Sequence, residues 1–503
     1  LSAGTSEEVF NHLYSTLFPK LKREFNGSMF DDDLAAERDA VRPQHLRAVG
    51  DFFAGHEIRA KQRALGFWPY DFAFIPVETI SAIYENFLEK EGKNEKRESG
   101  AYYTPHLLAE STLDLALEGT RSISGKRFLD PSCGSGIFLV LLFNRLAAEW
   151  NAANWDDKFE SPAAAYSAKD KALRAALASL RGIDKNLTAC RIACFSIYLA
   201  LLDQFTPSDV RTYIQQSDTG KLPCLLRFKD GRGRRPDIPV VWEADFLATV
   251  KVWERDGAER FDYIVGNPPW AGRGKKQIAH DFMKTAPVLL SESGCACLLL
   301  PTKVFFNKTD EFQSKWLREV SLEKVVQLSD YRFILFTNAI CPCVIARFTN
   351  RRPDVETHTV EYLTPKVTRV DLRQGAIPIT PGDRKEIPLR MLLAAVAQKA
   401  VTVVWKSRFW GTRRDLKFLN HLFALPCLGE KVDLLSRTHG KRKHPWAAGQ
   451  GCKPWTPKPG KEPDRKLRPF AELGNEWSTK DEFLTPEIID GQAVLPKSLC
   501  TTI

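Results

Sequence analysis

The sequence lacks any long hydrophobic run. A membrane-spanning helix needs about 18–20 apolar residues in a row, and the longest such run here, Ile137–Phe143, fits a buried helix. The chain opens at Leu1 without the basic and then apolar segment of a signal peptide. We therefore expect a cytoplasmic protein with no membrane partner. The absent initiator methionine, and an end at Ile503 that follows no evident closing element, indicate a fragment.

The sequence also lacks paired cysteine motifs. Its 11 cysteines are an odd number scattered along the chain, and most stand in apolar settings. Reduced, buried thiols are the expected state, which fits a cytosolic protein. Cys427, His439, His444 and Cys452 could together hold zinc, but no Cys-x-x-Cys pair anchors them, so no metal site is predicted.

Charge of one sign is only mildly in excess. Lys and Arg number 72 against 62 Asp and Glu, a net charge of +10, which favours a polyanionic partner without proving one. Hydrophobic residues make up 44% and charged residues 27%, which excludes a disordered chain. The length suggests about three domains.

The pattern of apolar residues changes along the chain. Residues 1–98 have helical spacing, as in Ile75–Leu88, and end in the charged segment Glu89–Glu98. Residues 99–352 alternate short apolar strands with helices, which predicts an α/β domain with a largely parallel sheet. Residues 353–503 form a more basic, Pro-rich mixed region. The expected strands are Arg127–Leu129, Leu180–Ile183, Val240–Phe246, Tyr263–Val265, Cys295–Leu300, Val325–Leu328 and Cys343–Phe348.

The first motif, Phe128–Leu139, runs from a strand through Asp-Pro-Ser-Cys-Gly-Ser-Gly into an apolar helix. Gly134 and Gly136 lack a Cβ, so a ligand can lie against this turn, and the helix N-terminus adds free N–H groups. A Gly-x-Gly pair alone would also fit a plain tight turn, and the third Gly of a dinucleotide fingerprint is missing. The longer string is far more specific.

Acidic residues end the next two strands. Asp184 stands where Rossmann-like sheets place a carboxylate on ribose hydroxyls, although it could instead cap the helix Leu187–Leu202. Asp245 can accept from an exocyclic amine and Phe246 can stack on its ring, while the alternative is a turn with Phe246 in the core. The residues alone leave both pairs of readings open.

The decisive motif is Asn267-Pro268-Pro269-Trp270, at the end of the strand that begins near Phe261. The two prolines fix the backbone and remove two N–H donors, so this segment offers carbonyl acceptors. Asn267 adds a side-chain acceptor and Trp270 a flat surface. The segment therefore predicts a slot for a planar NH2 group, against the alternative of a Pro-rich strand end over a core Trp.

The four motifs follow successive strands, and open α/β sheets bind ligands at the carboxyl ends of their strands. The set resembles the S-adenosylmethionine-dependent DNA adenine-N6 methyltransferases whose cofactor motifs precede the target-recognition region, and in particular the methylase units of type I and type IIG restriction-modification systems. Ser99–Pro105 resembles the first motif of that family, Ile75–Ile80 its helical lead-in, and Leu335–Ala339 a later motif. The resemblance covers about residues 75 to 350.

The resemblance implies a Rossmann-like class I methyltransferase fold, S-adenosylmethionine as cofactor, double-stranded DNA as substrate, and a prokaryotic cytoplasmic location. A specificity subunit or other defence proteins are implied partners. The enzyme would flip an adenine out of the duplex and methylate its N6 directly, without a strong base. The implied cofactor residues are Tyr102, Thr104, Asp130, Cys133, Gly134, Gly136, Asp184, Asp245 and Phe246, and the implied catalytic residues are Asn267, Pro268, Pro269, Trp270 and Phe336.

Two rival functions stay open. Asn-Pro-Pro-aromatic slots also serve methyltransferases that modify a protein glutamine or an RNA base. The chain could also be a cofactor-binding subunit without turnover in a phage-defence complex. The distance from Gly136 to Asp184 exceeds the usual spacing, so an insertion near Asn151–Lys169 is expected. Glu57–Lys61 has the wrong spacing for a nuclease, so cleavage is not predicted.

The basic C-terminal region is the candidate DNA contact. Lys441, Arg442 and Lys443 head a stretch rich in Lys and Arg in which Trp446 and Trp455 are interleaved. Phosphate contact and an ordinary solvated loop explain this stretch equally well.

Overall fold

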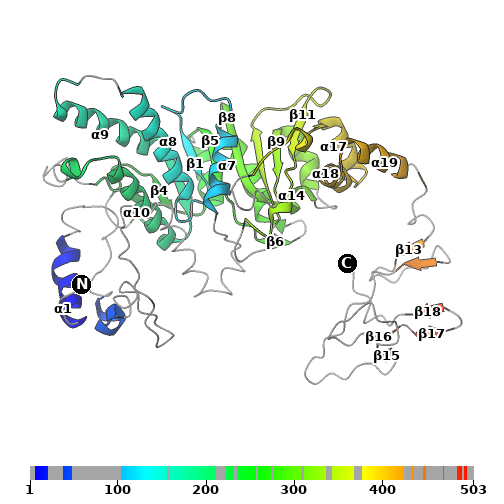
Figure 1. Cartoon of the computed structure of the whole chain (residues 1–503), viewed down its shortest axis with the longest axis horizontal. Coiled ribbons are helices and arrows are strands. Elements are labelled where there is room, and N and C mark those ends of the chain that lie inside the picture. The colour runs from blue at the N-terminus through cyan, green and yellow to red at the C-terminus, as the bar shows by residue number, and fades with distance from the viewer. Residues whose placement is uncertain are drawn as a thin grey trace. The chain divides into compact units, whose positions relative to one another are not determined.

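In the computed structural model the chain divides into two units, Leu1–Trp410 and Gly411–Ile503. Figure 1 shows the elements in chain order. No helix among the described residues is both long and apolar enough to cross a bilayer. The structure describes residues 6–20, 38–47, 104–155, 159–210, 222–231, 235–256, 259–273, 276–306, 311–335, 342–367, 377–423 and 425, and six short strands beyond residue 431.

The first unit is built on a ten-stranded sheet with the order β12-β11-β9-β10-β8-β5-β1-β2-β4-β3. All neighbours from β3 to β8 are parallel, β10 is antiparallel to both β8 and β9, and β11 is again parallel to β9. The chain moves outward from β1 in both directions, so the order reverses between β1 and β5. The strands are β1 Phe128–Asp130, β2 Leu180–Asp184, β3 Leu226–Arg227, β4 Val241–Glu243, β5 Phe261–Gly266, β8 Leu290–Pro301, β9 Ser321–Gln327, β10 Cys343–Thr349, β11 Thr359–Leu363 and β12 Arg384–Pro388.

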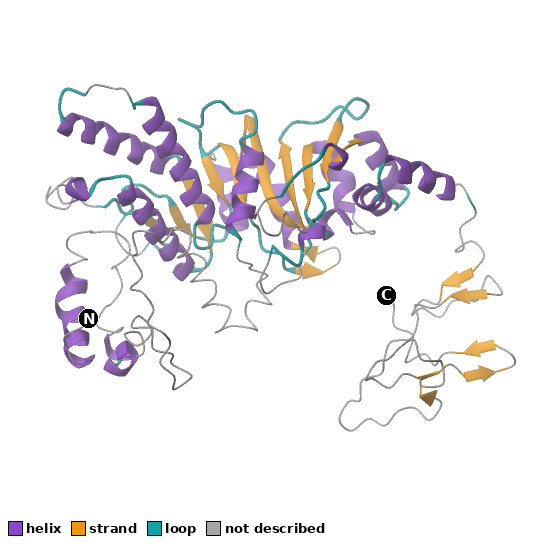
Figure 2. Cartoon of the chain, viewed as in Figure 1, coloured by secondary structure: helices purple, strands orange, loops and turns teal. Residues whose placement is uncertain are grey.

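Helices cover both faces of this sheet (Figure 2). Neighbouring strand residues enter opposite cores: Phe128 packs with α7, α8 and α10, and Leu129 with the helices of the other face. Continuous apolar strands follow from burial on both faces. The predicted α/β, Rossmann-like core is confirmed. The helices are α7 His106–Ala116, α8 Ile137–Ala153, α9 Pro162–Ala178, α10 Leu187–Asp203, α12 Phe246–Asp256, α13 Ile278–Leu289, α14 Lys303–Phe306, α15 Glu311–Glu319, α17 Leu389–Ala397 and α18 Val401–Trp410.

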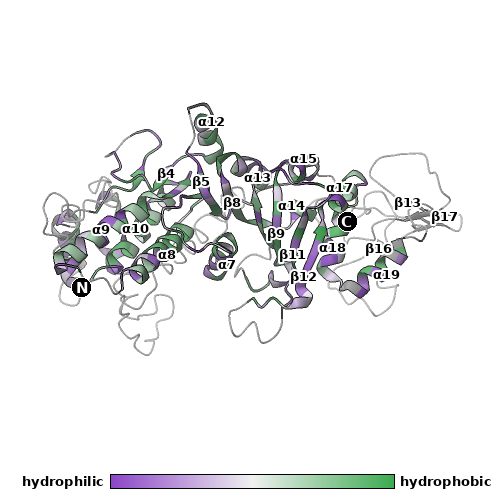
Figure 3. Ribbon diagram, turned by 90° about the horizontal axis from the view of Figure 1, so that it is seen from above, coloured by the Kyte–Doolittle hydropathy of each residue, from purple (hydrophilic) through white to green (hydrophobic). Residues whose placement is uncertain are grey.

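The helix α8 begins directly after the first motif. Its residues Ile137–Phe143 are all buried, as expected of the longest apolar run in the chain. Figure 3 shows this helix in the hydrophobic colour along most of its length. Gly136 precedes the helix with φ 90°, a backbone conformation that favours glycine. The motif therefore turns from strand to helix in the tight way that its glycines predict.

The sheet continues beyond the domain boundary expected at residue 352. That position falls between β10 and β11, and both β11 and β12 belong to the same sheet. The polar segment Thr349–Pro353 reads as a boundary in the sequence because it leaves the core, but Val360 and Tyr362 return to it fully buried. The helices α17 and α18 complete this end of the first unit.

Two other expected regions are described in part. The insertion between Gly136 and Asp184 contains α9, which packs against α8 and β2. In the region 1–98 the described segments are helical, with α1 at Ser6–His12, the π-helical turn η1 at Leu13–Leu17, and helical residues within 38–47. The segment Ile75–Glu98 lies outside the described residues.

The second unit contains one described helix and three pairs of short strands. These are α19 Arg413–Phe423, β13 Val432–Leu434 with β14 Trp446–Ala448, β15 Arg468–Pro469 with β16 Leu484–Thr485, and β17 Glu487–Ile489 with β18 Gln492–Val494.

Candidate active site

The motif residues meet at one edge of the sheet because their strands are parallel and in register. Asp130 of β1 pairs with Gly182, two residues before the end of β2. Asp184 in turn pairs with Glu243, the last residue of β4. The residue after β5 is Asn267. The carboxyl ends of β1, β2, β4 and β5 thus bring the four motifs together, beside the point where the strand order reverses.

The glycine turn is held by the neighbouring strand. The N–H of Gly134 donates to Asp184 Oδ2 at 2.9 Å, and the N–H of Cys133 donates to the carbonyl of Ile183 at 3.0 Å. Gly134 has φ 51° and Gly136 φ 90°. A Cβ on Gly136 would lie 2.9 Å from Ala193 Cβ, so α10 approaches this turn closely. The turn therefore needs glycine for both its conformation and its packing.

Asp130 is a fully buried acid under this turn. Its Oδ1 accepts from the N–H of Ser132 at 3.0 Å, and its Oδ2 has no hydrogen-bond partner among the described residues. The pKa of Asp130 is raised to about 8, mainly by burial; the Ser132 bond lowers this pKa and nearby Asp184 raises it. Asp130 Oδ1 lies 2.6 Å from where a Cβ on Gly266 would stand. The acid of the glycine turn thus touches the backbone just before Asn267.

Asp184 spans the first two motifs. Its Oδ1 accepts from the N–H of Asn186 at 2.8 Å, while Oδ2 holds Gly134. Burial raises the pKa of Asp184, although these two backbone bonds lower it. The helix α10 is capped by Asn186, whose side chain accepts from the N–H of Ala189 at 3.1 Å, so Asp184 is not the N-cap.

Cys133 is a buried member of the same turn. A Cβ on Gly182 would stand 3.0 Å from its Sγ. Burial raises the pKa of the Cys133 thiol well above its usual value, which keeps it neutral. The seven described cysteines are all buried and none of them forms a disulfide, as predicted.

In the third motif, Asp245 is partly exposed and Phe246 is buried. Asp245 pairs with Lys185 Nζ at 2.8 Å and accepts from the N–H of Ala248 at 3.3 Å at the start of α12. Its partial burial raises the pKa of Asp245, but the Lys185 pair together with the backbone hydrogen bonds from Ala248 and Leu247 lowers this pKa below its usual value. Phe246 is 3% exposed and stacks on Phe282 with ring centroids 5.0 Å apart. One face of the ring predicted to meet the cofactor is therefore occupied by α13.

Asn267 is joined to the start of α7. Its Nδ2 donates to Thr104 Oγ1 at 3.0 Å. Thr104 is also one of the implied cofactor residues, and its hydroxyl accepts from the proposed catalytic amide. The contact links two motifs separated by 163 residues.

Trp270 differs from the expected open surface. It is 6% exposed and belongs to the core on the side of α7 and α8. Its carbonyl accepts from Lys303 Nζ at 3.1 Å. The indole packs inward because a large apolar ring gains more from burial than from exposure at the sheet edge.

A buried polar cluster lies beside this segment and escaped the sequence analysis. Thr302 Oγ1 hydrogen-bonds Ser329 Oγ at 2.9 Å and donates to Gln327 Oε1 at 3.2 Å. All three side chains are buried at the carboxyl ends of β8 and β9, and Thr302 precedes Lys303. Polar residues at two strand ends are the signal that could have revealed the cluster, but their meeting depends on the strand order.

Several predicted site residues lie outside the described residues. They are Tyr102, Phe336, Lys441, Arg442 and Lys443, together with the four zinc candidates.

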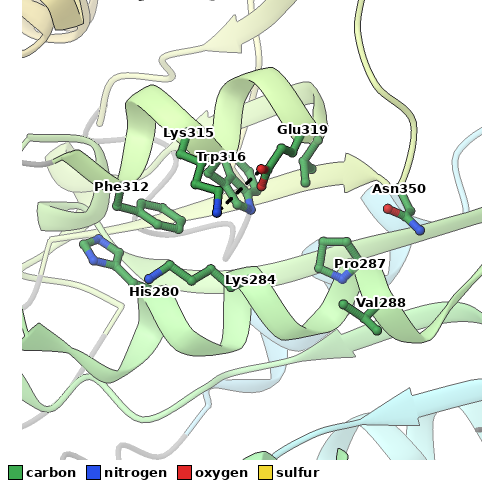
Figure 4. A pocket seen from close by; sticks show the side chains of 10 residues that line it. His280, Lys284, Pro287, Val288, Phe312, Lys315, Trp316, Glu319 and Asn350 are labelled. Atoms are coloured by element: carbon green, nitrogen blue, oxygen red, sulfur yellow. Dashed lines mark ion pairs between the residues drawn. The ribbon is translucent and has the colours of Figure 1, made fainter. Parts of the chain in front are cut away.

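A cavity of about 570 Å³ lies elsewhere, between α13 and α15 (Figure 4). Its wall includes His280, stacked on Phe312 at 4.2 Å between centroids, with Lys284 and Lys315 at the rim. None of the four motifs contributes to its lining. This cavity is therefore separate from the sheet edge where the four motifs meet.

Two family models match the segment that carries these motifs. Residues 77–207 match the N-6 DNA methylase family, and residues 178–334 match the Eco57I restriction-modification methylase family. The segment from residue 77 to residue 334 is thus similar to DNA N6-adenine methylases. The resemblance stated from the motifs is thereby confirmed, and S-adenosylmethionine is the methyl donor of this family.

Solved structures of restriction-modification methylases have a distant likeness to this chain. A modification subunit of a putative type I restriction enzyme from Vibrio vulnificus is 18% identical, with 64% of this chain and 58% of that chain covered and a TM-score of 0.38. A type I methyltransferase subunit from Streptococcus thermophilus is 12% identical, with 80% and 91% covered and a TM-score of 0.41. The EcoKI M protein is 12% identical, with 84% and 93% covered and a TM-score of 0.39. The chain thus spans 58% of the length of the Vibrio vulnificus subunit, and the fold description above rests on this chain's own sheet.

Proposed function

We propose that this chain transfers a methyl group from S-adenosylmethionine to N6 of a flipped adenine in DNA, within a bacterial restriction-modification or phage-defence system. The observation that carries the proposal is the contact between Asp130 and Gly266. It places the glycine turn, where a cofactor fits, directly against the Asn-Pro-Pro segment, where an amino group fits. Methyl transfer needs these two sites side by side.

The residues at the glycine turn suit this cofactor. Asp130 Oδ2 is a buried carboxyl oxygen without a hydrogen-bond partner among the described residues, and the ammonium group of the cofactor would favour the ionised form of this acid on binding. The start of α8 has no side-chain cap, so its N–H groups suit a carboxylate. Asp184 and Asp245 are the carboxylates proposed for the ribose and adenine ends, with Phe246, Cys133, Gly134 and Gly136 around them. When bound, the cofactor supplies an electrophilic methyl group on sulfur.

The chain's own part in the reaction is to hold the adenine amino group. Asn267 Oδ1 and the Pro268 carbonyl would each accept one N6 hydrogen, which draws the nitrogen lone pair out of conjugation and toward the methyl group. Pro268 and Pro269 have no N–H that would compete for these acceptors. The methylated nitrogen is acidic and loses its proton to solvent, so no strong base is needed.

The target base must leave the duplex to reach this segment. Trp270 and Phe336 are the proposed stacking partners that offset this cost. Since Trp270 is buried in the free protein, its ring would be uncovered when DNA binds. Lys441, Arg442 and Lys443 are proposed phosphate contacts, a specificity subunit a proposed partner, and the cytoplasm the proposed location.

The test is methylation of DNA by the chain and its Asn267→Ala variant. Tritiated cofactor and unmethylated DNA, followed by digestion to nucleosides, should yield labelled 6-methyladenine. The variant should lose about 10²-fold or more in rate, since one acceptor at the reacting nitrogen is gone. Asn350→Ala is the matched control, because Asn350 is exposed on the wall of the separate cavity.

The outcomes separate the rival functions. Label in a protein glutamine or in RNA, with none in DNA, would refute the proposal and favour the first rival. Mapping of methylated bases in a host carrying the whole gene system tests the second rival. If the Asn267→Ala variant left methylation unchanged in that host, this chain would not be the subunit that catalyses the transfer.

A further inference from the structure

The side-chain amide of Asn267 must point in one direction to work. An amide has an oxygen that accepts and a nitrogen that donates, and the two are nearly equal in size. Packing alone therefore does not decide which of them faces an incoming group. The adenine amino group is itself a donor, so a reversed amide would set two donors against each other.

Thr104 contacts the nitrogen end of this amide. Its Oγ1 accepts from Asn267 Nδ2 at 3.0 Å, and Thr104 is 7% exposed. With the nitrogen held there, Oδ1 points away from Thr104. The bond connects the amide to a residue that comes from a different element and a distant part of the sequence.

Thr104 is itself held rigidly. It precedes Pro105, and a residue before proline is kept out of the helical region of backbone conformation. The Pro105 carbonyl accepts from the N–H groups of Leu108 and Ala109, at 2.9 and 3.0 Å, as α7 begins. The β-branched side chain of Thr104 has few rotamers. Its hydroxyl thus has a fixed place against the sheet.

The backbone of the Asn267–Trp270 segment has its own support. The Trp270 carbonyl accepts from Lys303 Nζ at 3.1 Å, and the two prolines stiffen the stretch between. Loss of the Thr104 hydroxyl should therefore remove one contact of the amide and leave the backbone in place.

We propose that Thr104 is a positioning residue that holds the Asn267 side chain, through Nδ2, in place for the adenine amino group. This inference rests on the proposed function. It gives Thr104 a part in the transfer step, distinct from the cofactor contact that the family resemblance implies. Pro105 and the backbone hydrogen bonds at the start of α7 are the structural support for that role.

The experiment compares Thr104→Val, which keeps the shape and removes the hydroxyl, with Thr104→Ser, which keeps the hydroxyl. Both are measured as the full chain, in the DNA methylation assay at saturating cofactor and DNA. We expect kcat of Thr104→Val to fall about tenfold, the size of one lost neutral hydrogen bond, and Thr104→Ser to stay within about twofold of the wild type. Binding of S-adenosylhomocysteine, measured by calorimetry, should be unchanged in both variants.

A double variant shows whether Thr104 acts through Asn267. In the Asn267→Ala background, Thr104→Val should cause no further loss, because no amide remains to orient. Should Thr104→Val fail to fold, Thr104→Ala makes the same comparison, since it also removes the hydroxyl.

Three results would overturn the inference. Weaker S-adenosylhomocysteine binding with unchanged kcat would make Thr104 a cofactor residue. Unchanged kcat and unchanged binding would mean that the contact has no role. An equal loss in both backgrounds would mean that Thr104 does not act through Asn267. Failure of the proposed function itself is recognised separately, because the wild-type chain would then make no 6-methyladenine.

Discussion

The carboxylate of Asp184 holds the backbone N–H of Gly134, a residue 50 positions earlier, at 2.9 Å. This bond ties the end of β2 to the glycine turn after β1. A residue predicted to bind a ribose therefore also shapes the turn beside it.

Asp184→Ala should lower the free energy of unfolding by about 1–3 kcal/mol, because the Gly134 N–H loses its acceptor. S-adenosylhomocysteine binding should weaken as well, since the turn loses its support. Asp184→Asn keeps an acceptor oxygen and should lose less stability. Urea unfolding and calorimetry measure the two effects. Equal stability of Asp184→Ala and the wild type would show that the turn does not depend on this bond.

Asp130 should make stability fall as the pH rises from about 4 to about 8. Its pKa is 3.8 in an unfolded chain and about 8 in the fold, mainly because of burial. Between those values the folded state keeps a proton that the unfolded state releases, so unfolding becomes easier by about 1.4 kcal/mol per pH unit. Its stabilising contribution is fully present below pH 4 and is lost as the pH passes about 8.

Asp130→Asn removes this titration and is the comparison for that prediction. The difference in unfolding free energy between variant and wild type, measured in urea at pH 5, 6 and 7, should grow in favour of the variant. Parallel pH profiles would contradict the buried, protonated state of Asp130.

Gly182→Ala should destabilise the protein by about 1–3 kcal/mol through overpacking. Its Cβ would stand 2.6 Å from Leu139 Cδ1 and 3.0 Å from Cys133 Sγ, both in the core under the glycine turn. Gly382→Ala is the matched control, because its Cβ would meet only Thr380 Oγ1 at 3.7 Å among the described neighbours. The control should change stability by less than about 0.5 kcal/mol. Equal melting temperatures of the two variants would disprove the close packing at Gly182.

A chain that ends at residue 352 should aggregate, whereas one that ends at residue 410 should stay monomeric. The shorter chain lacks β11 and β12 and leaves the edge of β9 unpaired, with Val325 stripped of its neighbour Tyr362. Size-exclusion chromatography of both chains makes the comparison. A shorter chain that elutes without aggregates would instead support the domain boundary at residue 352 that the sequence predicts.

The sequence predicted the central strands well, because strands buried on both faces are apolar runs that end in recognisable turns. Leu180–Ile183 and Cys343–Phe348 each lie within one residue of β2 and β10 at both ends. The sequence did not predict β11 and β12, because the polar segment Thr349–Pro353 resembles the end of a domain. It also extended the third strand to Phe246, where the structure has already begun α12.

The candidate site was predictable in its residues and less so in their contacts. The four motifs meet at one edge as expected, because parallel strands bring their carboxyl ends together. The burial of Trp270 and the bond between Thr104 and Asn267 depend on which side of the sheet α7 covers. The spacing of residues within α7 does not indicate which side of the sheet this helix covers.

The reversed direction of β10 has a consequence for which changes this fold can tolerate. Because β9 and β10 run in opposite directions, the chain leaves the sheet after Gln327 and re-enters it at Cys343 at the same edge, the one where the four motifs meet. A parallel strand would have needed a crossover passing back along one face of the sheet. A change in the length of the connection between β9 and β10 should therefore leave both helical layers in place.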